Sequence, residues 1–104
     1  PVLERVPENT EYLVRTADVL RRTGREGEAA ERIAAALAID RCYPEARMLA
    51  AHLAFTQGRY ADQLATLRVG ADECPPSATV LNNLAYALAR LTVQADGAPC
   101  TVTA

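Results

Sequence analysis

Residues 24–58 read GREGEAAERIAAALAIDRCYPEARMLAAHLAFTQG, a stretch that opens with Gly24-Arg25 and closes with Gly58, which Arg59 follows. The two glycines mark one point of a pattern that repeats after 34 residues. Each follows a run with helical spacing and precedes a second helix-like run that contains alanine. Because glycine readily adopts the left-handed backbone that ends a helix, the pattern predicts helical hairpins in succession. A period of 34 residues is that of a helix-turn-helix array.

The spacing of apolar residues on both sides of this stretch predicts further helices. The expected helices cover about 10–22, 28–39, 44–57, 61–72 and 78–91. Gly70 lies inside the fourth of them and is expected to weaken its end by about 1 kcal/mol relative to alanine. Two prolines, Pro75 and Pro76, then force a break before Ser77, the expected cap of the last helix.

The chain divides into three parts on this basis. We expect a lead-in at 1–9, a helical repeat domain at 10–91 with units 10–43, 44–77 and 78–91, and a flexible or loosely docked tail at 92–104.

The composition points to an all-α core built from small residues. Half of the 104 residues are hydrophobic, yet the aromatic residues are only four tyrosines and one phenylalanine. A net charge of −2 argues against general nucleic-acid binding. No apolar run approaches the roughly 20 residues of a membrane span, so no membrane partner is expected.

The three cysteines, Cys42, Cys74 and Cys100, are odd in number and have no metal-ligand spacing. They are interpreted as reduced thiols of a cytoplasmic protein. Cys42 and Cys74 hold nearly equivalent linker positions, expected to be more than about 7 Å apart and too far for a disulfide.

The phased anchors resemble the tetratricopeptide repeat family. Its repeat has the signature W-x2-L-G-x2-Y, then A-x3-F, then P. The matching residues are Leu13-x2-Thr16-Ala17-x2-Leu20 with Ala29-x3-Ile33, Arg47-x2-Ala50-Ala51-x2-Ala54 with Gln63-x3-Leu67 and Pro75, and Leu81-x2-Leu84-Ala85-x2-Leu88. Thr16, Arg41, Arg47 and Gln63 depart from the signature, and the third repeat has only its first helix.

The resemblance implies an all-α fold of about five helices, two full repeats and a half, stacked as a short right-handed superhelix. Small residues at the helix crossings, Ala17, Ala29, Ala51 and Ala85, suit such close packing. In this family the first helix of each repeat lines a concave groove.

Positions of those first helices that are not needed for the core form a column that steps by 34 residues. The candidate groove residues are Val14, Asp18, Arg21, Met48, His52, Phe55, Asn82, Tyr86 and Arg90. Met48, Phe55 and Tyr86 offer apolar and aromatic contacts. Arg21 and Arg90 offer partners for carboxylates at the ends of the groove. The alternative is that these are ordinary solvated or half-buried helix residues.

One branch of the family grips the C-terminal carboxylate of chaperones with basic groove residues. The corresponding residues here are Val14, Asp18, Leu49, Thr79 and Asn83. None of them is cationic, and Asp18 would repel a carboxylate, so this binding mode is not expected.

No enzyme activity, cofactor or metal is expected. His52 is the only histidine, and neither its helix neighbours nor the distant Cys42 would form a catalytic pair with it. The predicted function is protein–protein interaction, with a peptide or protein segment bound in the groove. The alternatives are self-association as a homodimer or scaffold through exposed Leu84 and Leu88 of the last helix, or a regulatory segment of a larger protein.

Overall fold

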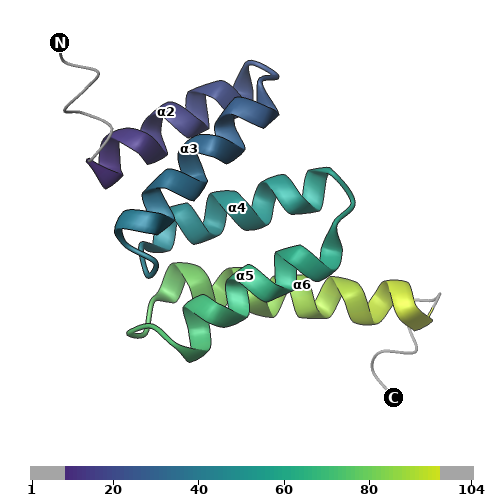
Figure 1. Ribbon diagram of the computed structural model, residues 1–104. Helices are drawn as coiled ribbons and strands as arrows, with labels where there is room; N and C mark the ends of the chain where they lie inside the picture. The colour runs from purple at the N-terminus through teal and green to yellow at the C-terminus, as the bar shows by residue number, and fades with distance from the viewer. Residues whose placement is uncertain (1–8, 97–104) are drawn as a thin grey trace, which may run out of the picture.

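The computed structural model describes the backbone of residues 9–96 and the side chains of residues 9–90. This part of the chain folds as five helices without a strand (Figure 1). They are α2 (Thr10–Arg22), α3 (Glu26–Ile39), α4 (Pro44–Thr56), α5 (Tyr60–Asp72) and α6 (Ala78–Asp96). The prediction of an all-α fold with about five helices is confirmed.

The two glycines end helices as predicted. Gly24 follows α2 with φ of 85° and Gly58 follows α4 with φ of 76°, and among the described residues only these two have positive φ. Beyond each glycine the chain closes the helix in the same way, because the Arg25 amide donates to the Leu20 carbonyl and the Arg59 amide to the Ala54 carbonyl, both at 2.8 Å. These bonds satisfy carbonyls that the last turn leaves unpaired.

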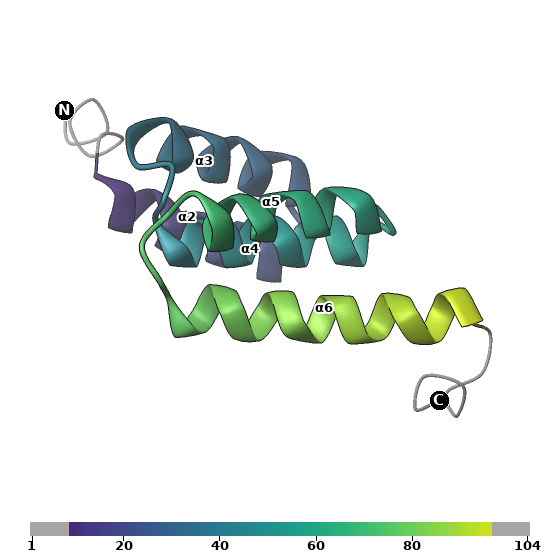
Figure 2. The same ribbon diagram turned by 90° about the horizontal axis from the view of Figure 1, so that it is seen from below.

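The helices pack mainly on their neighbours in sequence. α2 packs on α3, α4 on α5 and α5 on α6, while α4 also contacts α2, α3 and α6. Seen from below (Figure 2), α3 and α5 lie on one side of α4, and α6 lies on the other. The core has two clusters, one shared by α2, α3 and α4 and one shared by α4, α5 and α6. Ala17, Ala29 and Ala51 are buried, so the predicted close crossings are present there.

α6 departs from the prediction in its end and its buried face. It continues to Asp96 instead of ending near residue 91, so the first residues of the predicted tail are helical; residues 97–104 lie outside the described part. Val80 and Ala87 are buried, whereas Leu81 is 46% exposed and Ala85 is exposed. The close crossing expected at Ala85 is therefore absent, because no helix in the described range follows α6 to cover this face.

Gly70 also has a different role from the one expected. It is buried where α5 meets α6, and a Cβ built there would lie 3.0 Å from Cγ1 of Val80. The missing side chain lets the two helices approach closely, so Gly70 supports packing between helices rather than only weakening one of them.

The prediction for Cys42 and Cys74 was wrong. The two residues form a disulfide, with their Cα atoms 5.5 Å apart. Beside it the Arg41 guanidinium pairs with the Glu73 carboxylate at 2.7 Å. Because α4 and α5 form an antiparallel hairpin, the linker before α4 and the linker after α5 meet at the same end of it. The prediction treated the two linkers as equivalent positions of successive repeats, and such positions do not show that both linkers lie at the same end of one hairpin.

Candidate functional site

Two adjoining hollows lie along α2, α4 and α6. The first, of about 390 Å³, is lined by Val14, Arg15, Asp18, Arg21, Arg22, Glu45, Met48, Leu49 and His52. The second, of about 220 Å³, is lined by Met48, Ala51, His52, Phe55, Gln63, Asn83, Tyr86 and Arg90. Met48 and His52 belong to both, so the hollows form one surface, which we call the groove.

The structure brings together eight of the nine predicted groove residues. Asn82 alone does not line either hollow, and its neighbour Asn83 does. Gln63 of α5 was not among the predicted groove residues, because the resemblance drew attention to the first helix of each repeat only. It reaches the groove because α5 packs directly on both α4 and α6.

At the α2 end of the groove the arginines are paired with carboxylates of the protein. The Asp18 carboxylate accepts a hydrogen bond from Arg21 at 2.6 Å and forms an ion pair with Arg22 at 2.9 Å. The hydrogen bond from Arg21 is the main cause of a lowered Asp18 pKa, which partial desolvation opposes. Arg15 pairs with Glu11 of the same helix at 2.7 Å. Each of these arginines therefore already has a carboxylate partner within the protein.

At the α6 end an arginine is stacked on aromatic rings instead. The guanidinium carbon of Arg90 lies 4.0 Å from the centre of the Phe55 ring and 5.0 Å from that of Tyr86. Both distances fall within the range of cation–π attraction. Phe55 is itself held by Tyr60, with ring centres 5.8 Å apart. Tyr86 is 69% exposed, so its ring is available at the surface.

The groove has the chemistry of a binding surface. Met48 provides a half-buried apolar side chain in the middle of it, and His52 lies exposed beside Met48. No serine, threonine or cysteine lines either hollow of the described chain. The described residues also contain no cluster of histidine, cysteine and carboxylate side chains that could hold a metal ion.

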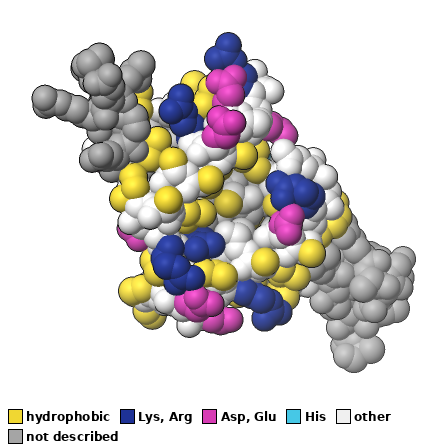
Figure 3. Space-filling view, viewed as in Figure 1, with side chains coloured by type: hydrophobic (Ala, Val, Ile, Leu, Met, Phe, Trp, Pro, Cys, Tyr) yellow, Lys and Arg dark blue, Asp and Glu magenta, His cyan; other side chains and the backbone are white. Residues whose placement is uncertain are grey.

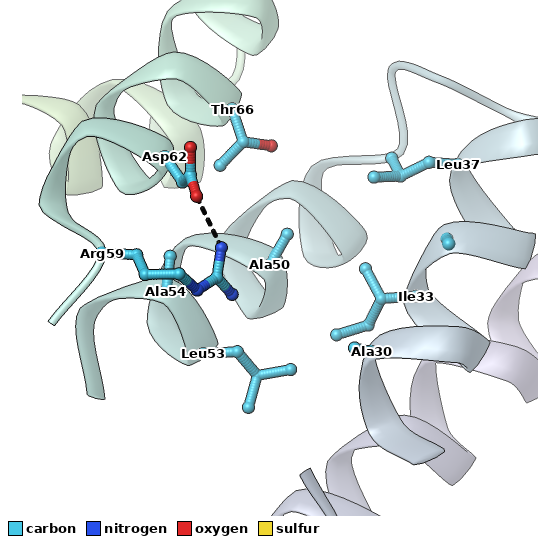
Figure 4. Close-up of a pocket in the computed structure, with 10 residues that line it drawn as sticks. Ala30, Ile33, Leu37, Ala50, Leu53, Ala54, Arg59, Asp62 and Thr66 are labelled. Carbon is cyan, nitrogen blue, oxygen red and sulfur yellow. Dashed lines mark hydrogen bonds and ion pairs between the residues drawn. The ribbon is translucent and has the colours of Figure 1, made fainter. Parts of the chain in front are cut away.

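A further hollow, of about 230 Å³, lies on the opposite face between α3, α4 and α5. In the space-filling view hydrophobic side chains gather around the middle of this face (Figure 3). Ile33, Leu37 and Leu53 point toward the hollow from α3 and α4 (Figure 4). At its rim, Arg59 is already paired with Asp62 at 2.6 Å. This hollow was not predicted from the sequence; Ala30 and Ala34, one turn apart on α3, are part of its lining.

No known protein family, curated protein or solved structure matches the chain. In the described part of the chain, every helix is too short or too polar to span a membrane.

Proposed function

We propose that this protein is a tetratricopeptide-like interaction module that binds an extended peptide segment of a partner protein in the groove. The observation that carries the proposal is the continuity of the two hollows across α2, α4 and α6 through Met48 and His52. Side chains at 34-residue steps, such as Val14 and Met48, line the groove together, as a stacked repeat requires.

The groove offers contacts that suit a peptide backbone and its side chains. Met48 and the rings of Phe55 and Tyr86 provide apolar contact area for alternate side chains of a ligand. The side-chain amide nitrogen of Asn83 donates to the Thr79 carbonyl at 2.7 Å, which leaves its oxygen as an acceptor for a peptide N–H. Because rigid helices already hold these groups, binding would require little ordering of the protein.

The test is selection of binders from a random peptide library, followed by mapping of one bound peptide with ¹⁵N-labelled protein. Amide shifts are expected along α2, α4 and α6, and none in the hollow between α3 and α5. Tyr86→Ala should weaken binding about tenfold, the effect typical of an aromatic contact at an interface. Ile39→Ala is the matched control, because Ile39 is also a large exposed apolar residue but lies outside the groove. Shifts confined to α3 and α5 would contradict the proposal.

Self-association is a second candidate, favoured by the outer face of α6. Leu81 lies two 34-residue steps after Leu13, which α3 covers in the first hairpin. Leu81 is 46% exposed and Leu88 is 37% exposed, whereas Leu84 is partly buried against the second core cluster. A second copy that packs its own α6 there would cover this face and form a dimer.

Sedimentation separates this candidate from a monomeric binding module. Self-association predicts a sedimentation coefficient that rises with concentration and a Leu81→Gln variant that stays monomeric. A wild-type protein that remains monomeric at high concentration would exclude the dimer and leave peptide binding untouched.

A further inference from the structure

The contacts of one residue, Arg90, indicate which kind of ligand the groove would accept. Its guanidinium carbon lies over the rings of Phe55 and Tyr86, 4.0 and 5.0 Å from their centres. A cation–π contact does not use the N–H donors of the guanidinium group as a hydrogen bond would. None of these donors makes a hydrogen bond or ion pair within the described chain. Arg90 is therefore oriented by rings but has no anion.

The described surroundings of Arg90 supply no anion either. The hollow that contains it is lined by no aspartate or glutamate. At the α2 end, in contrast, Arg21 and Arg22 share Asp18, and Arg15 has Glu11. The sequence offered Arg21 and Arg90 as equal candidates for a carboxylate, and the structure separates them by their partners.

We propose that the groove binds peptides through an acidic side chain, glutamate or aspartate, whose carboxylate accepts hydrogen bonds from Arg90 beside the rings of Phe55 and Tyr86. This inference rests on the proposed function and adds the chemistry of the ligand and the end of the groove that holds it. An arginine fork matches a carboxylate with two parallel hydrogen bonds, and a neutral side chain cannot replace the charge.

The surface around Arg90 favours an acidic side chain over a chain terminus. Tyr86, one turn before Arg90, is 69% exposed, so the described part of this hollow does not enclose a ligand on every side. At the α2 end, the hollow is lined by Arg15, Arg21 and Arg22, and each of these arginines already has a carboxylate partner within the protein. We therefore place the acidic side chain of the ligand at the α6 end of the groove.

The test starts from the same random peptide library and compares wild type with Arg90→Gln and Arg90→Lys. Arg68→Gln is the matched control, because Arg68 is an exposed arginine of α5 without an ion pair in the described chain. Wild type should enrich peptides with an acidic residue at a fixed distance from an apolar one. Affinity for a selected peptide should fall about tenfold or more in Arg90→Gln and stay unchanged in Arg68→Gln. Arg90→Lys should give an intermediate loss, because lysine keeps the charge without the planar fork.

A change in the peptide keeps the test independent of protein folding. Replacing the acidic residue of the selected peptide by its amide should weaken binding to wild type as much as Arg90→Gln does, and should have little further effect in that variant. Binders without acidic enrichment would overturn this inference while the proposed function stands. A library that gives no binder would overturn both. A selected peptide that loses binding when its C-terminus is amidated would show that Arg90 holds a chain terminus, contrary to this proposal.

Discussion

Gly24 and Gly27, which lie around the connection between α2 and α3, have different backbone conformations. Gly24 has φ of 85°, where a side chain is strained, whereas Gly27 lies in the first turn of α3 at an ordinary φ. A Cβ would meet no atom within 4 Å at either position. Gly24→Ala should therefore lower the free energy of unfolding by about 1 kcal/mol, through backbone strain alone. Gly27→Ala, the control, should raise it by about 0.5 kcal/mol, because alanine is the better helix former.

Urea unfolding of the two variants beside wild type measures both changes. Shifts of the same sign in the two variants would contradict the assignment of Gly24 as the left-handed helix end.

The pair of arginines on Asp18 makes a pH-dependent contribution to stability. The pKa of Asp18 is lowered from 3.8, first by the hydrogen bond from Arg21. A carboxyl group with a lowered pKa in the folded state stabilises the protein above the unfolded pKa and loses that effect as pH falls through the folded pKa. Because the Asp18 side chain is 29% exposed, screening keeps the effect at about 0.5 kcal/mol at neutral pH.

Asp18→Asn should thus be less stable than wild type at pH 7, and the difference should shrink below about pH 4. Urea unfolding at several pH values measures it. Glu11→Gln is the control. It removes the ion pair with Arg15, which is more exposed than the pairs of Asp18, and should change stability less at every pH. A difference for Asp18→Asn that stays constant down to pH 3 would show that its origin is not electrostatic.

Among the elements, the contact of α5 with α6 depends on Gly70. Val80 is fully buried and β-branched, so it has little freedom to move away from a new Cβ at 3.0 Å. Gly70→Ala would improve helix propensity by about 1 kcal/mol, yet overpacking in a buried contact costs about 1–3 kcal/mol. We expect a net loss of about 1 kcal/mol in the free energy of unfolding.

The double variant Gly70→Ala/Val80→Ala tests this cause. Removing the Val80 methyl groups should relieve the overlap, so the double variant should be less destabilised than the sum of the two single variants. Additive losses would mean that Gly70 is not limited by Val80.

The bounds and buried residues of some helices could be predicted from the sequence better than those of others. α2 and α4 have glycine ends and a covering helix after them, so both their bounds and their buried alanines were predictable. α6 has the best match to the repeat signature, yet its signature positions Leu81 and Ala85 are exposed. A signature assumes the helix that normally packs against it, and in the described chain α6 has only α4 and α5 as neighbours.

In the whole molecule, the 34-residue step was enough to predict most of the residues that line the groove. Eight candidate residues line it because stacking hairpins of equal length places equivalent positions side by side. The electrostatics of the groove could not be predicted, since a repeat position does not show that Asp18 takes up Arg21 and Arg22 while Arg90 stacks on Phe55. Whether these residues bind a ligand stays a prediction until the selection experiment.

The disulfide was missed because it depends on the closure of a whole hairpin. Its presence also removes the basis on which a cytoplasmic location was expected, because that prediction rested on reduced thiols and disulfides are rare in the cytosol. The Cys42–Cys74 link encloses all of α4 and α5, and α4 carries Met48, His52 and Phe55 of the groove. The central hairpin is thus a covalently closed ring that supports the middle of the groove.

Opening this ring should destabilise the protein more than any other change considered above. The cysteines are 32 residues apart, and the chain-entropy estimate for a loop of that length is about 3–4 kcal/mol. In a Cys100→Ser background, so that only Cys42 and Cys74 can pair, reductant should lower the melting temperature strongly. Cys42→Ser/Cys74→Ser should show the same low value with or without reductant. Equal melting temperatures for the oxidised and reduced protein, with the oxidation state checked by mass, would show that the Arg41–Glu73 pair and the helix packing hold the hairpin closed without the covalent link.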